Sequence, residues 1–306
     1  MNKNNPFFKQ AELMLRVIPH VAAERCFALK GGSAINLFVR NMPRLSVDMD
    51  LTYLPLEPRE RTLENIEDAL KRIAVAVRDS IPGSRVHETH TQGSQRTVKL
   101  IVRSQHVQIK IEPNQVVRGS VFPCEERDLS EKAEELFELS TSIQTLSMAD
   151  LYGSKICAAL DRQHPRDIFD IKILMENEGI TEEIRKAFVV YLASHDRPMN
   201  ELIEPTLKDM RQIFEKEFVG LTADPVQYHD LITARERFIT ILKKELTDNE
   251  KAFLFSVKQG QPEWELIGIE GIDKLPAIQW KLMNIQKMDR KKHAESLEKL
   301  RMGLGL

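Results

Sequence analysis

The sequence predicts an α/β (α+β) fold in which a lobe built on a mixed sheet, residues 1–130, precedes a helical lobe, residues 131–306. Up to about residue 112, segments with the apolar period of a helix alternate with segments that have the two-residue period of a strand. After the charged stretch 125–135, nearly every periodic segment is helical. Alternating helices and strands followed by helices alone are typical of two such lobes.

The first lobe is expected to contain three helices, an acidic strand and a hairpin. The helices are expected over residues 10–28, 34–40 and 62–80. The strands are expected over residues 45–53, 96–103 and 107–111, the last two joined by Ser104-Gln105-His106. The polar segment 86–93 contains His87 and His90, and we interpret it as a surface loop rather than a metal site.

The second lobe begins with a helix that opens at Ser147-x-x-Asp150, a capping-box pattern, and carries Lys155. His164-Pro165 ends this helix, and the next one starts near Arg166. Further helices are expected over residues 184–194, 201–217, 225–246 and 279–300. Trp264 and Trp280 are expected to pack inside the lobe. The stretch 281–301 is rich in Lys and Arg, and we interpret it as a solvated helix face, with part of an RNA-binding surface as the alternative.

The acidic strand is the most informative segment. A period of two puts Asp48 and Asp50 on one face together with Ser46. Two carboxylates on one strand face repel each other unless a positive charge lies between them. A solvated edge strand is the structural alternative, but the pattern favours a site for a divalent metal ion.

A glycine turn lies upstream of this strand. Gly31, Gly32 and Ser33 open the expected helix 34–40, so backbone N–H groups at a helix start are available to a phosphate. An ordinary N-cap is the structural reading of Ser33. A phosphate-binding turn followed by paired aspartates is the outline of a nucleotidyl-transfer site.

Composition sets the broad class. Hydrophobic residues make up 42% of the 306, enough for real cores, and the net charge of −2 excludes a non-specific nucleic-acid binder held by bulk charge. The three cysteines are far apart, which argues against a disulfide framework or a structural zinc site. No apolar run is long enough for a membrane span and no signal-peptide pattern is present, so we expect a cytoplasmic protein.

Four blocks of sequence resemble the AbiEii/AbiGii/MenT family, the nucleotidyltransferase toxins of type IV toxin–antitoxin systems. The blocks occur in order from near the start of the chain to near its end: Leu29-Lys30-Gly31-Gly32-Ser33-Ala34, Arg44-Leu45-Ser46-Val47-Asp48-Met49-Asp50, Lys155 with Arg166-Asp167-Ile168-Phe169-Asp170, and Leu275-Pro276-Ala277-Ile278-Gln279-Trp280-Lys281. The resemblance implies a nucleotidyltransferase-like mixed-sheet lobe whose cleft receives Lys155 and Asp167 from the helical lobe.

The resemblance also implies roles for residues. Asp48 and Asp50 would bind Mg²⁺, and the NTP would contact the following residues: Gly31, Gly32, Ser33, Lys155 and Arg166. Ser46 is expected in the same nucleotide pocket because it shares the strand face of Asp48 and Asp50. Asp167 would belong to the catalytic set. Glu112, at the expected end of strand 107–111, would be a third acidic residue, although a surface position is the alternative. For Lys155, Arg166, Asp167 and Asp170 the structural alternative is an ion-pair network.

The expected function is that of an Mg²⁺-dependent nucleotidyltransferase toxin. It would transfer NMP from an NTP to the 3′ end of tRNA and so block translation, with a cognate antitoxin as partner and no membrane association. Two alternatives stay open: transfer to a protein or a small molecule, and a non-catalytic binding module with a degenerate fold.

Overall fold

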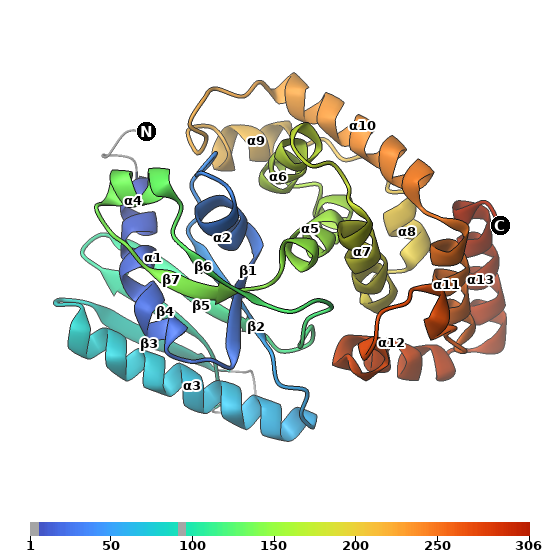
Figure 1. The fold of residues 1–306 in the computed structure, drawn as a ribbon, viewed down its shortest axis with the longest axis horizontal. Coiled ribbons are helices and arrows are strands. Elements are labelled where there is room, and N and C mark those ends of the chain that lie inside the picture. Colours follow the sequence, from blue (N-terminus) through green and yellow to red (C-terminus); the bar gives the residue numbers. More distant parts are fainter. Residues whose placement is uncertain (1–5, 91–95) are drawn as a thin grey trace. The chain divides into compact units, whose positions relative to one another are not determined.

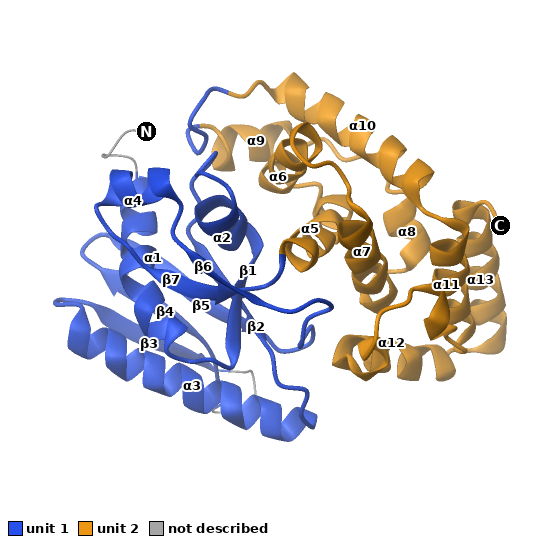
Figure 2. Cartoon of the chain, in the orientation of Figure 1, with its two compact units in different colours: residues 1–147, 220–225 blue, residues 148–219, 226–306 orange. Residues whose placement is uncertain are grey.

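The computed structural model describes residues 6–90 and 96–306. The chain divides into two compact units, Met1–Ser147 with Gly220–Pro225 and Met148–Val219 with Val226–Leu306 (Figure 2). The first unit holds the sheet and the second is helical (Figure 1), which confirms the predicted fold class. The predicted boundary at residue 130 falls ahead of α4 (Glu131–Phe137), and the first unit continues to Ser147 because β7 (Ser142–Thr145) joins its sheet.

The first unit is organised around a seven-stranded mixed sheet with the order β3-β4-β5-β2-β1-β7-β6. Besides β7, the strands of this sheet are β1 (Phe27–Lys30), β2 (Asp48–Tyr53), β3 (Arg85–His90), β4 (Thr97–Ser104), β5 (Val107–Asn114) and β6 (Glu125–Asp128). β2 is antiparallel to β1 and parallel to β5, and the predicted hairpin β4–β5 is present.

Two long helices complete the core of this unit. α1 (Pro6–Ala22) and α3 (Arg59–Ser80) contact each other, and they pack against β5, β7 and β4. In α3 the residues Ile66, Leu70, Ile73 and Val77 recur at helical spacing and are all buried. In β2, Met49 and Leu51 are fully buried, whereas Asp48 and Asp50 are only partly buried.

Several predicted boundaries in the first unit are wrong. The acidic strand begins at Asp48 rather than at residue 45, because residues 43–45 pair instead with residues 221–223 through Leu45 N to Leu221 O (2.8 Å) and Ala223 N to Pro43 O (3.0 Å). The first helix ends at Ala22, and β1 follows it. The predicted loop at 86–93 is strand β3 as far as His90, and its last residues, 91–93, lie outside the described residues.

The second unit is a helical assembly. Its helices are α5 (Met148–Arg162), α6 (Pro165–Glu176), α7 (Glu182–Ser194), α8 (Met199–Ile203), α9 (Arg211–Glu217), α10 (Tyr228–Glu245), α11 (Asp248–Gln259), α12 (Pro276–Gln286) and α13 (Arg290–Leu304). The segment predicted as one helix over 201–217 is interrupted between α8 and α9, where Pro205 lies. None of the described helices is both long and apolar enough to cross a membrane.

The two tryptophans have different environments. Trp264 packs on Phe253 with ring centroids 5.8 Å apart, as expected. Trp280, on α12, is 54% exposed, so its predicted packing role is wrong. The predicted helix 279–300 is likewise two helices, because Asp289 caps a new helix, α13, by accepting hydrogen bonds from Lys291 N and Lys292 N.

Candidate active site

The glycine turn follows β1 directly. Gly31 has a φ of +73°, a conformation that L side chains rarely adopt, and a Cβ there would lie 3.1 Å from Asp50 Oδ2. A Cβ at Gly32 would lie 2.7 Å from Arg44 Nη2 and 2.9 Å from Ser46 Oγ. Both glycines therefore let the backbone of the turn approach functional side chains more closely than any other residue would allow.

The predicted helix after the turn begins at Gly31, earlier than expected. A short α-helical segment, α2 (Gly31–Ala34), continues as the π-helix Ile35–Val39. Its wider turn is closed by the bond from Arg40 N to Ile35 O at 2.7 Å, and Asn36 Nδ2 donates to Gly32 O at 2.9 Å. π-turns are frequent at functional sites.

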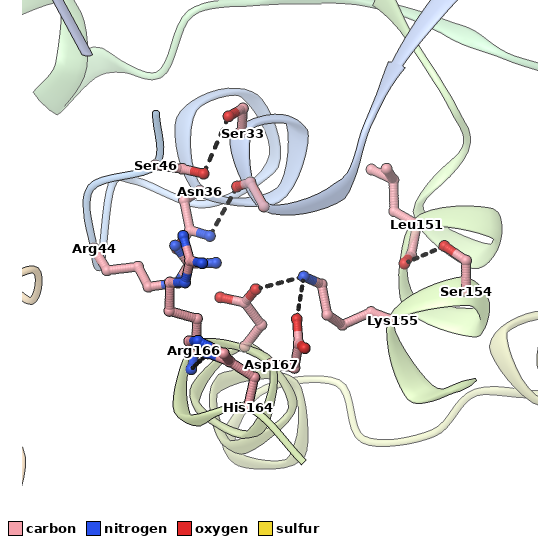
Figure 3. Close-up of polar contacts among 12 residues, drawn as sticks. Ser33, Asn36, Arg44, Ser46, Leu151, Ser154, Lys155, His164, Arg166 and Asp167 are labelled. Carbon is pink, nitrogen blue, oxygen red and sulfur yellow. Dashed lines mark hydrogen bonds and ion pairs between the residues drawn. The ribbon is translucent and has the colours of Figure 1, made fainter. Parts of the chain in front are cut away.

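Ser33 and Ser46 meet inside the first unit (Figure 3). Their hydroxyl oxygens are 3.1 Å apart, and Ser33 Oγ donates to the backbone oxygen of Asp48 at 2.5 Å. Both side chains are buried. Lys30, not Ser33, is the N-cap of α2. The hydroxyl of Ser33 ties the glycine turn to the start of the acidic strand.

Asp48 and Asp50 alternate with buried residues along β2, as predicted. The parallel register places Asp48 beside Lys110 and Asp50 beside Glu112 on β5, while the antiparallel register places Asp50 beside Lys30 on β1. Residues that are paired in register point to the same face of a sheet. The structure therefore brings the three predicted carboxylates of the first unit to one face. Glu112 does not end β5, which continues to Asn114.

Lysines accompany these carboxylates on the sheet. Lys99 Nζ, on β4, lies 3.8 Å from Glu112 Oε1. Lys30, Asp50, Glu112 and Lys99 thus follow one another across four neighbouring strands, and all four line a cavity of about 430 Å³ together with Val98, Pro113, Asn114 and Gln115. Sequence reasoning assigned no role to Lys30, Lys99 or Lys110. The period of two links Lys110 with Glu112, but only the strand order shows which carboxylates the three lysines accompany.

Arg44 is a further residue that sequence reasoning left without a role. It is 2% exposed, its Nη1 donates to Leu45 O at 2.9 Å, and its Nη2 lies where the Gly32 side chain would be. A guanidinium remains charged even when it is buried. A permanent positive charge therefore lies beneath the glycine turn.

The donor set of the first unit fits a hard cation. Carboxylate oxygens are the ligands that Mg²⁺ prefers, and Mg²⁺ keeps several waters or substrate phosphates as further ligands. Within residues 6–90 and 96–306, no three His, Cys, Asp or Glu side chains are grouped so that they could hold a metal ion. Asp48 and Asp50 would accordingly supply two carboxylates, with Glu112 next to Asp50.

The second unit brings Lys155 and Asp167 (Figure 3) together with Asp170. Lys155 Nζ lies 3.0 Å from Asp167 Oδ1 and 3.1 Å from Asp170 Oδ2, and the three side chains are 7%, 4% and 1% exposed. Arg162 also pairs with Asp167, at 2.8 Å. Burial raises the pKa of Asp167, but the positive charges of Lys155 and Arg162 hold that pKa below its usual range. The ion-pair network weighed as the structural alternative is thus present.

Local chemistry explains how α5 and α6 present this network. Pro165 occupies the first turn of α6, and the ring of His164 caps the helix by accepting a hydrogen bond from Arg166 N at 3.2 Å. The Arg166 side chain extends toward Glu217, with 4.0 Å between Nη2 and Oε2. The role of Arg166 stays a prediction.

The model of the family described as nucleotidyl transferase AbiEii toxin, type IV toxin–antitoxin system, matches residues 12–284. The chain belongs to the AbiEii family. It is similar in structure to MenT4, a nucleotidyltransferase toxin from Mycobacterium tuberculosis H37Rv, with a TM-score of 0.59 over 96% of this chain and 93% of that one. The sequence identity is 14%, so this likeness shows a shared fold. No curated protein matches the chain.

Membership of the AbiEii family confirms the predicted resemblance and the enzyme class, a nucleotidyltransferase that is the toxin of a toxin–antitoxin system. Enzymes of this class take an NTP as substrate. The roles given above to individual residues of this AbiEii toxin remain predictions. Those of the first unit rest on its geometry, and those of the second unit rest on the family resemblance.

Proposed function

We propose that this AbiEii toxin transfers NMP from an NTP to the 3′ end of tRNA, so that the tRNA cannot be charged and translation stops. The observation that supports the transfer chemistry is the position of Asp50. In the sheet it lies between Lys30 and Glu112, and its Oδ2 lies 3.1 Å from the point that a Cβ of Gly31 would occupy. Phosphate-binding backbone and metal-binding carboxylates are adjacent there. The tRNA acceptor comes from the family resemblance.

The residues of the first unit have distinct tasks in this reaction. N–H groups of Gly31, Gly32 and Ser33 bind the triphosphate, with the charge of Arg44 beneath them. The acceptor hydroxyl oxygen attacks the α-phosphorus, the bond from that phosphorus to the bridging oxygen breaks, and pyrophosphate leaves. Glu112 accepts the proton of the hydroxyl.

Asp48 and Asp50 would hold Mg²⁺, which when bound neutralises charge on the phosphates as they transfer. Lys30 and Lys99 balance the carboxylates until substrate arrives. We extend the proposal to Lys155, Arg166 and Asp167 of the second unit, which the resemblance assigns to the same nucleotide. For these three, the support is the sequence pattern and not a distance.

The test is incubation of the protein with Mg²⁺, each α-labelled NTP in turn, and total RNA or lysate protein. We expect label in tRNA, and we expect Asp48→Ala and Asp50→Ala each to lower transfer by roughly 10² or more, because charge develops where these carboxylates act. Asp79→Ala is the matched control, since Asp79 is an exposed carboxylate at the end of α3.

Each other outcome has a clear meaning. Label in protein or in a small molecule would support the transferase activity but would contradict tRNA as the acceptor. If folded Asp48→Ala and Asp50→Ala proteins transfer label at the wild-type rate, the proposed roles of Asp48 and Asp50 are wrong. An adjacent antitoxin gene whose product suppresses transfer would support the toxin role. Growth arrest by cytoplasmic expression of the wild type, but not of Asp48→Ala, would place the reaction in the cytoplasm.

A further inference from the structure

One face of α12 is exposed although it carries large apolar side chains. The helix contacts α7 and α11, and it buries Ala277, Ile278 and Ile285. On the outside, Trp280 is 54% exposed and Met283 is 42% exposed. An exposed tryptophan presents a large flat ring that has no partner ring among the aromatic contacts of the described residues.

Exposed cations follow this apolar face immediately. Lys287 is the C-cap of α12, and Arg290, Lys291 and Lys292 form the first turn of α13. All four side chains are exposed. Within the described residues, none of them forms an ion pair, whereas Arg301 later in α13 pairs with Glu298 at 3.3 Å.

The position of these cations is unfavourable for the helix itself. Positive side chains in a first turn oppose the helix dipole, whereas negative ones stabilise it. α7 and α11 of the same unit carry acidic residues in their first turns, whereas in α13 the acidic N-cap, Asp289, is followed by three cations. Helix stability therefore does not account for three successive cations here, and a ligand with negative charge would.

The tryptophan and the cations lie close together along the chain. Trp280, Met283 and Lys287 are spaced i, i+3 and i+7, so they share a face of the helix. The rise of about 1.5 Å per residue separates Trp280 from Lys287 by about 10 Å along the axis. The chain then turns at Asp289 into the cations of α13. We call this set, Trp280, Met283, Lys287, Arg290, Lys291 and Lys292, the α12–α13 surface.

We propose that the α12–α13 surface binds RNA, with a base stacked on Trp280 and backbone phosphates on the cations. Aromatic stacking beside a row of cations is how proteins hold nucleic-acid strands without reading sequence. An apolar protein partner would leave the four cations without counter-charges, which disfavours it. This inference rests on the proposed function in so far as it takes the RNA to be the acceptor.

The direct test is fluorescence, because the chain has two tryptophans and Trp264→Phe leaves Trp280 as the sole indole. Total tRNA should quench this signal. Replacing Lys291 and Lys292 together by Ser should weaken binding by tenfold or more at low salt and reduce the salt slope by roughly 1.5. The control is Lys243→Ser with Lys244→Ser on α10, which removes the same charge from another exposed place.

A second variant keeps the test valid if Trp264→Phe does not fold. Trp280→Leu in the otherwise unchanged chain should lower tRNA affinity by roughly tenfold in a filter-binding assay. Equal affinity in the wild type and in both surface variants would overturn the proposal. Equally strong quenching by poly-glutamate would instead assign the surface to an acidic protein.

The two proposals can fail separately. Binding of tRNA is measured without NTP, so its outcome does not depend on nucleotidyl transfer. Binding without label transfer to tRNA would overturn the proposed acceptor alone. If the Lys291 and Lys292 variant transfers label to tRNA with an unchanged KM for tRNA, only the proposed RNA binding by the α12–α13 surface would be overturned.

Discussion

Replacement of Lys155 separates a structural from a catalytic role for the buried network of the second unit. In Lys155→Ala, the carboxylates of Asp167 and Asp170 lose an ammonium at 3.0 and 3.1 Å. Both are almost fully buried, so their charges would stay desolvated. Removing one partner of a buried pair costs about 3–5 kcal/mol, which corresponds to a fall in Tm of roughly 10 °C for a unit of this size.

A compensated variant tests whether the loss arises from uncompensated charge. Lys155→Met combined with Asp167→Asn and Asp170→Asn removes the charges together, and Arg162, whose side chain is 61% exposed, can turn to solvent. We expect this variant to regain at least half of the lost Tm, measured by calorimetry. If Lys155 or Asp167 also acts in the reaction, the variant stays inactive although it is stable.

The pH dependence provides a check with a definite sign. The folded-state pKa of Asp167 is below its unfolded value, so its contribution to stability is present at neutral pH and is lost as the pH falls through the folded pKa. The difference in stability between the wild type and the compensated variant should therefore shrink below about pH 4. An unchanged Tm in Lys155→Ala would refute the structural reasoning, and wild-type transfer by that variant below its Tm would remove Lys155 from the site.

Three further predictions concern packing, the glycine turn and a partly buried lysine. Gly153→Ala should lower the stability of the second unit by about 1–3 kcal/mol in denaturant unfolding, because the new Cβ would lie 2.7 Å from the backbone of α7. The control is Gly303→Ala, whose Cβ would meet only a side chain at 3.9 Å and which should leave stability unchanged or raise it. Gly32→Ala should weaken NTP binding severalfold by calorimetric titration by displacing the Arg44 guanidinium, and unchanged affinity would exclude a close approach there. Burial lowers the pKa of Lys281 to about 8. Between pH 8 and 10 only the unfolded state keeps the proton of this lysine, so the free energy of unfolding should rise by roughly 1–3 kcal/mol over that range. Lys281→Met should abolish the rise.

Much of the candidate site follows from local sequence. The alternation along residues 48–51 places Asp48 and Asp50 on one face in any sheet, because it depends only on the two-residue period. The start of α6 at Pro165 and the stripe of buried residues in α3 are equally local, since proline geometry and the helical period act within a few residues.

The short strands could not be recognised in this way. β3 reads Arg-Val-His-Glu-Thr-His and β6 reads Glu-Glu-Arg-Asp, and neither has the apolar alternation of a half-buried strand. Their strand conformation comes from hydrogen bonding to β4 and β7. Likewise, β2 starts late because residues 43–45 pair with a segment more than 170 positions further along the chain.

The sequence by itself determined the family, the order of the two lobes, and the residue types available for nucleotidyl transfer. Only the tertiary structure decided which charges are neighbours: Lys30, Lys99 and Lys110 beside the carboxylates of the sheet, and Lys155 between Asp167 and Asp170. The physical reason is that side-chain periodicity is fixed within a segment, whereas strand register and helix packing depend on contacts between segments that are far apart in the chain.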